Sequence, residues 1–216
     1  MTNRETEVKI PVGNLVLVGN LAVPRGALGI VLFAHGSGSS RLSPRNQFVA
    51  KEFNTAKIGT LLFDLLTGEE EERDMFTAEY RFNIRLLAER LVGATEWAQK
   101  SQQTKGFAFG YFGASTGAAA ALIGASKLSG DIKAVVSRGG RPDLAMDYLS
   151  KVVAPTLLLV GGLDTEVIDL NRQAMAKMKA EKKLVIIPGA THLFEEPGKL
   201  EEVAQASKDW FLRYLK

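Results

Sequence analysis

The sequence predicts an α/β protein whose sheet is mostly parallel, doubly wound and covered by helices on both faces. Short apolar segments alternate with amphipathic ones along the chain, and this alternation of strand and helix is typical of such a sheet. The later strand candidates are apolar throughout, as expected of strands that helices cover on both sides. The chain has 216 residues, 46% of them hydrophobic, which is enough for a sizeable core.

Eight segments are the candidate strands. The first two, residues 5–10 and 15–23, are separated by a Gly-Asn turn and predict an antiparallel hairpin. The other six predict the parallel part of the sheet: residues 28–35, 58–64, 105–112, 132–138, 156–162 and 183–189. We see no internal repeat or linker among them, so we expect a single domain over residues 1–216.

Helical segments lie between the later strands. Ser43-Pro44 supplies a capping residue and a first-turn proline for the first helix. The expected helices are residues 46–56, 78–98, 118–125 and 166–178, and a last one that begins near Gly198. Residues 65–76, LLTGEEEERDMF, form the only long charged connection, which we interpret as a solvated loop or, alternatively, as part of an active-site rim. No segment is long enough to predict a large cap domain.

Composition excludes several classes of site. The chain has no cysteine, so disulfides, thiolate metal sites and a cysteine nucleophile are ruled out. Its 27 basic and 24 acidic residues leave a small surplus without a concentrated basic run, so we expect no nucleic-acid partner. Neither a signal peptide nor a membrane span is evident. We expect a cytoplasmic protein, monomeric or homodimeric, without a membrane partner, metal or cofactor.

Three polar residues each follow an apolar strand: Ser115, Asp164 and His192. In open parallel sheets, ligands bind outside the carboxyl ends of the strands, so these residues are expected at one edge. A serine hydroxyl becomes an effective nucleophile when a histidine takes its proton, and an acid orients that histidine. The chain has only two histidines. They are His35, within AHGSGSS, and His192.

The serine lies within GASTG, residues 113–117, which matches the G-x-S-x-G nucleophile elbow of the α/β-hydrolase fold. The order Ser, Asp, His also matches, and the resemblance covers nearly the whole chain. The small size and the GLDT and GATH contexts most resemble the dienelactone-hydrolase-like branch of small serine hydrolases. This resemblance implies an α/β-hydrolase fold and an oxyanion hole made by the backbone N–H groups of Ser37 and Thr116. It also implies that AHGSGSS is the oxyanion loop, which we expect His35 to brace, and this leaves His192 as the candidate base. Dienelactone hydrolases proper carry cysteine where this chain has Ser115, which argues against dienelactone as the substrate.

These observations predict a carboxylic ester hydrolase acting on small, short-chain acyl substrates through an acyl-enzyme, with Ser115, His192 and Asp164 as its triad. A thioesterase or lactonase with the same triad is an alternative. A catalytically silent hydrolase-fold protein that binds a small ligand is another. Asp164 could instead cap the following helix, in which case Glu166 or Asp169 would supply the acid.

Several arginines also lie beyond strand ends, among them Arg41, Arg138 and Arg141. Guanidinium groups at this edge could bind a carboxylate or phosphate of the substrate through paired hydrogen bonds. The interpretation that we favour is structural pairing, for example of Arg141 with Asp143. Substrate binding by these arginines remains the second hypothesis.

Overall fold

The computed structural model describes residues 5–215, and eight strands within them form one sheet. The strands are β1 (Thr6–Val12), β2 (Leu15–Ala22), β3 (Gly29–Ala34), β4 (Gly59–Phe63), β5 (Ala108–Ala114), β6 (Ile132–Arg138), β7 (Thr156–Gly161) and β8 (Lys182–Ile187). Their order across the sheet is β1-β2-β4-β3-β5-β6-β7-β8. The pairs β1–β2 and β2–β4 are antiparallel and all others are parallel, so the predicted hairpin and mostly parallel sheet are confirmed.

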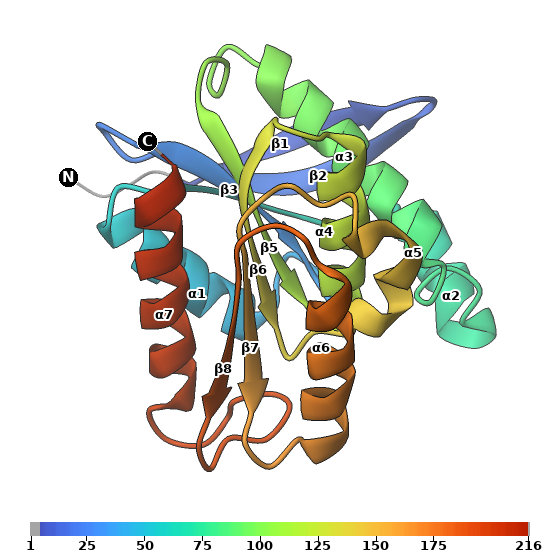
Figure 1. Ribbon diagram of the computed structural model, residues 1–216. Helices are drawn as coiled ribbons and strands as arrows, with labels where there is room; N and C mark the ends of the chain where they lie inside the picture. Colours follow the sequence, from blue (N-terminus) through green and yellow to red (C-terminus); the bar gives the residue numbers. More distant parts are fainter. Residues whose placement is uncertain (1–4, 216) are drawn as a thin grey trace.

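Helices cover both faces of the sheet, as predicted. They are α1 (Pro44–Thr55), α2 (Gly68–Thr77), α3 (Ile84–Lys100), α4 (Thr116–Lys127), α5 (Met146–Leu149), α6 (Thr165–Lys177) and α7 (Lys199–Tyr214), with a short 3₁₀ helix at Pro142–Ala145. Figure 1 shows α1 and α7 together on one side of the sheet, and α3, α4 and α6 on the other. Among residues 5–215 no large cap stands over the strand ends, and no helix is long and apolar enough to span a membrane.

The two faces of the sheet are packed in different ways. Under α1 and α7, Phe33, Phe53, Phe112 and Phe211 form an aromatic cluster with ring centroids 4.8–5.9 Å apart. On the other face, the alanines of α4 let this helix lie close to the sheet and to α3. Burying these apolar side chains supplies the main stabilisation of the fold and makes the strand ends a rigid platform for the site.

The segment at residues 65–76 departs from the predicted solvated loop, because most of it is helix α2. Thr67 Oγ1 accepts the N–H of Glu70, and the Glu70 carboxylate accepts the N–H of Thr67, which is a capping box. The acidic residues of the first turn also favour the helix, since negative charge is stabilised at a helix N-terminus.

The helix predicted at residues 78–98 begins later than expected. Ala78 ends α2 in the left-handed conformation, with φ of 52°, and residues 79–83 form a turn. Helix α3 then begins at Ile84, where the Asn83 side chain accepts the N–H of Leu86. Tyr80, which lies inside the range predicted as helix, therefore belongs to the turn.

Candidate active site

The serine of GASTG occupies a strained turn between β5 and α4. Ser115 has φ of 50° and ψ of −121°, a conformation that non-glycine residues rarely adopt. A Cβ on Gly113 would lie 2.4 Å from Cα of Ala118, and one on Gly117 would lie 2.2 Å from the carbonyl oxygen of Ala34. The two glycines are therefore required by steric crowding, and the turn they permit holds the serine at the edge of the sheet.

The structure brings the three predicted residues of the triad together. Nε2 of His192 lies 3.4 Å from Oγ of Ser115, and Nδ1 of His192 lies 2.6 Å from Oδ2 of Asp164. The His192 side chain is 38% exposed and that of Asp164 is 16% exposed. The longer of the two contacts is common in unliganded enzymes, where hydrogen bonds to the nucleophile tighten once substrate is bound.

The alternative roles considered for Asp164 do not fit its surroundings. Asp164 precedes α6, yet its side chain makes no capping hydrogen bond and instead contacts His192. Asp169 bonds Arg172 on the surface of α6, and Glu166 is exposed in the first turn of that helix. Of these three carboxylates, Asp164 is the one placed to orient the histidine.

The predicted oxyanion donors lie beside the serine, with one complication. The N–H of Thr116 is the first of α4 and has no acceptor among the described residues, as is usual at a helix N-terminus. The N–H of Ser37 instead donates to Oγ1 of Thr116 over 2.9 Å. Gly36 lets the loop approach, since a Cβ there would lie 3.2 Å from Cβ of Ser115. The two N–H groups thus belong to segments that meet at Ser115, and of the two only that of Thr116 has no acceptor among the described residues.

His35 braces the loop that carries Ser37, as the sequence predicts. Its Nε2 accepts the N–H of Leu65, and its Nδ1 lies 3.0 Å from the carbonyl oxygen of Gly36. This pattern requires a neutral ring with the proton on Nδ1. Burial lowers the pKa of His35 and so favours the neutral form. With both ring nitrogens engaged, His35 is not placed to act as a base.

A cavity of about 260 Å³ adjoins the loop of residues 35–39 on the side of α2 and α3. Its other lining residues are Leu66, Glu71, Asp74, Met75, Arg81 and Leu87. Sequence reasoning named none of these side chains as binding residues, although it allowed that residues 65–76 could form a rim. Thr67 followed by Glu70 is the sequence pattern of a capping box, and it could have predicted that a helix lines this side of the cavity.

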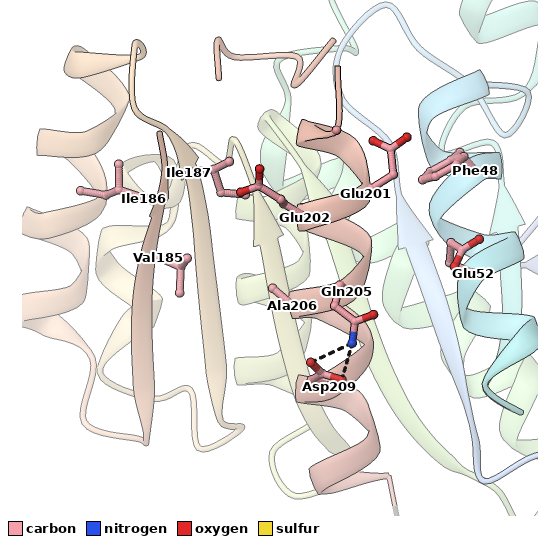
Figure 2. Close-up of a pocket in the computed structure, with 11 residues that line it drawn as sticks. Phe48, Glu52, Val185, Ile186, Ile187, Glu201, Glu202, Gln205, Ala206 and Asp209 are labelled. Carbon is pink, nitrogen blue, oxygen red and sulfur yellow. Dashed lines mark hydrogen bonds between the residues drawn. The ribbon is translucent and has the colours of Figure 1, made fainter. Parts of the chain in front are cut away.

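A larger cavity, of about 840 Å³, lies elsewhere, between α1, β8 and α7. Figure 2 shows that its lining includes apolar Val185, Ile186 and Ile187 of β8, with Glu201 and Glu202 on α7. It contains no member of the triad. No group of three or more His, Cys, Asp or Glu side chains within residues 5–215 could hold a metal ion.

The arginines at the strand ends differ in their partners. Arg41 bonds both carboxylate oxygens of Asp64, one through its backbone N–H and one through its side chain. Arg141 forms a paired contact with Asp143, at 2.8 and 2.9 Å, which confirms the predicted structural pairing. The Arg138 guanidinium is bonded only to the side-chain oxygen of Asn46, at 3.5 Å, among the described residues. Two of the three candidate binding arginines are therefore already engaged by carboxylates.

Known proteins that resemble this chain were found by family, by sequence and by structure. The model of the dienelactone hydrolase family matches residues 60–216. The crystal structure of a dienelactone hydrolase from Anabaena variabilis is 56% identical, with a TM-score of 0.98 and 99% of each chain covered. The structure of Est1E from Butyrivibrio proteoclasticus is 17% identical, with a TM-score of 0.80 over 96% of this chain and 98% of that one, which shows a shared fold.

A longer relative carries a different name. A protein of Mycobacterium tuberculosis, strain H37Rv, with the provisional name phosphoribosyl transferase is 52% identical over 212 residues. The match covers 98% of this chain but only 47% of that protein. The present chain therefore spans about half the length of this relative.

Proposed function

The chain belongs to the dienelactone hydrolase family, and we propose that it is a serine hydrolase that cleaves carboxylic esters of small acids. The observation that carries this proposal is the continuous contact from Ser115 through His192 to Asp164. Those are the three groups that acyl transfer requires, a nucleophile, a base and an orienting acid.

In the proposed first half-reaction, Oγ of Ser115 attacks the acyl carbon while its proton passes to Nε2 of His192. Asp164 holds the Nδ1–H of the ring and stabilises the imidazolium that forms. The carbonyl oxygen, now negative, accepts the free N–H of Thr116 and competes with Oγ1 of Thr116 for the N–H of Ser37. Collapse of this intermediate expels the alcohol, which takes the proton from His192, and leaves an ester on Ser115.

In the proposed second half-reaction, water attacks the acyl-enzyme and gives its proton to Nε2 of His192. The carboxylic acid leaves, and Ser115 recovers its proton from His192. No external oxidant, reductant or metal is needed for this cycle. The 260 Å³ cavity has no triad residue in its lining, but it borders the loop of Ser37, so we assign the acyl group to it, and its size favours a short chain.

The transferase name of the longer relative does not direct this proposal. That protein is about twice as long as the region matched here, so its name describes a larger chain. The contacts of His192 with Ser115 and Asp164 support acyl transfer instead. We therefore attribute ester hydrolysis to this chain.

The proposal is tested by an ester, thioester and lactone panel measured with the wild type and with Ser115→Ala. We expect esters to be cleaved best, and the Ser115→Ala variant to lose that turnover while retaining the wild-type circular dichroism spectrum. A fluorophosphonate should label the wild type stoichiometrically at Ser115 and leave the variant unlabelled. Absence of labelling in the wild type would favour a silent ligand-binding protein, and faster turnover of thioesters or lactones would correct the substrate class.

A further inference from the structure

Strand β8 stands at one end of the sheet and leaves a row of backbone groups without a strand partner. Among residues 5–215 it pairs with β7 alone. The carbonyl oxygens of Glu181 and Ile187 accept N–H groups from β7 and from the residue that follows it. Backbone groups alternate in direction along a strand, so those of Lys182, Leu184 and Ile186 point away from β7. Such an open edge pairs readily with a further strand.

A groove with apolar walls runs beside this edge. It is the cavity of about 840 Å³ between α1, β8 and α7, which we call the β8 groove. Figure 2 shows Val185, Ile186 and Ile187 on its β8 side and Ala206 of α7 facing them. Ile186 is 38% exposed although it lies within a strand. A strand added at the edge would therefore also cover apolar side chains, which favours association.

The two ends of this surface carry opposite charges. Near the start of β8, Lys183 is exposed and forms no ion pair among the described residues. It shares a face of the strand with Val185 and Ile187, since side chains alternate, and that face lines the groove. At the other end of β8, Glu202 of α7 lies beside Ile187 (Figure 2). Its Oε1 accepts Nζ of Lys199 over 2.7 Å, and its Oε2 has no partner within residues 5–215.

An antiparallel second copy of the strand matches this charge distribution. In an antiparallel pair the start of one strand lies beside the end of the other, so a two-fold axis brings Lys183 of each copy to Glu202 of the other. A parallel copy would instead place lysine against lysine. Lysines on an edge strand usually discourage pairing. Here they occupy only the first two positions of KKLVII and leave an apolar run of four residues.

We propose that β8 is the interface of a homodimer, in which the β8 strands of two copies pair antiparallel and join their sheets. The proposal does not depend on the proposed ester hydrolysis. The second copy supplies partners for the edge N–H and C=O groups of Leu184 and Ile186. It covers the apolar side of the β8 groove, and it pairs Lys183 with Glu202 at two symmetric contacts.

The ion pairs are tested by sedimentation velocity of the full chain over a roughly hundredfold range of concentration. We expect the wild type to change from monomer to dimer, and Lys183→Glu and Glu202→Lys each to weaken dimerisation by about tenfold or more, because each opposes like charges at both contacts. An equimolar mixture of the two variants, and the double variant, should recover the dimer. Lys105→Glu, exposed in the turn before β5 and outside the groove, is the charge control.

The strand pairing is tested by Ile186→Pro, with Ile186→Val as its matched control. Proline removes an N–H that points away from β7, so the pairing of β8 with β7 loses no hydrogen bond. Valine keeps this N–H and the preference for a strand. We expect Ile186→Pro to be monomeric and Ile186→Val to dimerise, with circular dichroism showing that both are folded. In the wild type, hydrogen exchange at the amides of Leu184 and Ile186 should slow as the protein concentration rises.

Two results would overturn the proposal. One is a wild type that stays monomeric at every concentration, which would leave the β8 edge to a different partner. The other is a dimer that persists unchanged in Ile186→Pro and in both charge variants, which would place the interface on another surface. Recovery of the dimer in the mixture of charge variants supports the antiparallel arrangement, since only that arrangement joins residue 183 of one copy to residue 202 of the other.

Discussion

The elbow, residues 113–117, and the rim, residues 65–82, lie on either side of the loop that carries Ser37, yet they are held in place by different forces. In the elbow, crowding decides the conformation, because Gly113 and Gly117 leave no room for a Cβ. In the rim, pairing decides it, since Asp74 bonds Arg81 and Glu70 bonds Arg90. Steric crowding in the elbow can therefore be recognised from a short sequence motif. The ion pairs of the rim cannot, because their partners lie at separate positions along the chain.

The largest effect that we predict is on the free energy of unfolding, and it is tested by replacing one glycine of the elbow and one of the rim. Gly117→Ala places a Cβ 2.2 Å from the Ala34 carbonyl oxygen, so we expect a loss of roughly 4 kcal/mol or more in the free energy of unfolding. Gly68→Ala, at the start of α2, meets nothing within 4 Å and should stabilise by up to about 1 kcal/mol. Urea denaturation measures both changes. Similar stabilities for the two variants would break the distinction between a crowded elbow and a tolerant rim.

The next effect concerns the chemical step. Asp164→Asn keeps the size of the side chain but no longer accepts the Nδ1–H of His192 as a carboxylate, so we expect kcat to fall by about 10³- to 10⁴-fold. Asp169→Asn, five residues along the chain on the exposed side of α6, serves as the matched control and should remain within about twofold of the wild type. Initial rates at saturating ester measure both. A loss below about tenfold in Asp164→Asn would show that another group orients the histidine.

The loop that carries Ser37 and the rim are also expected to differ in their sensitivity to acid. Burial lowers the pKa of His35 below its ordinary value, so on unfolding the ring takes up a proton when the pH is below about 6.5. Stability should therefore fall as pH drops from 6.5 toward the folded pKa, by up to about 1.4 kcal/mol per pH unit. His35→Gln should lose this part of the slope in urea denaturation between pH 7 and 5.

Asp74 of the rim provides the control for that pH series. Burial acts to raise its pKa, but hydrogen bonds from the N–H groups of Tyr80 and Arg81 and from the Arg81 guanidinium outweigh burial and lower it. A lowered carboxyl pKa contributes stability that is fully present above about pH 4 and is lost only as pH falls further. Asp74→Asn should thus leave the slope between pH 7 and 5 unchanged. The same slope in wild type and His35→Gln would refute the assignment to His35.

Most of the fold and the centre of the site could be predicted from the sequence because their signals are local. The apolar runs identified all eight strands, and the GASTG motif located the turn that the conformation of Ser115 now explains. The chain order of Ser115, Asp164 and His192 at strand ends was enough to predict their convergence, since parallel strands direct their carboxyl ends to one edge.

The features that could not be predicted depend on contacts between residues far apart along the chain, which no local sequence pattern reveals. The glutamates of residues 69–72 were interpreted as a solvated loop, whereas Glu70 caps α2 and bonds Arg90, twenty residues away. The contact of Ser37 N–H with Thr116 Oγ1 could not be foreseen, because it depends on how two loops meet. The isolation of Arg138 likewise became visible only when the partners of Arg41 and Arg141 were known.

The smallest predicted effect lies in the rim and concerns the length of the acyl chain. Met75 of α2 lines the 260 Å³ cavity and is 64% exposed, so its side chain can be shortened without opening the core. We expect the wild type to favour acyl chains of about two to four carbons, since each further methylene needs space that this cavity lacks. Met75→Ala should raise kcat/KM for the next longer esters by about two- to fivefold and leave acetate esters unchanged. Phe76→Ala, the exposed neighbour outside the cavity lining, is the control. If both variants show the wild-type preference for chain length, the rim does not contact the acyl group, and the 260 Å³ cavity is not its binding site.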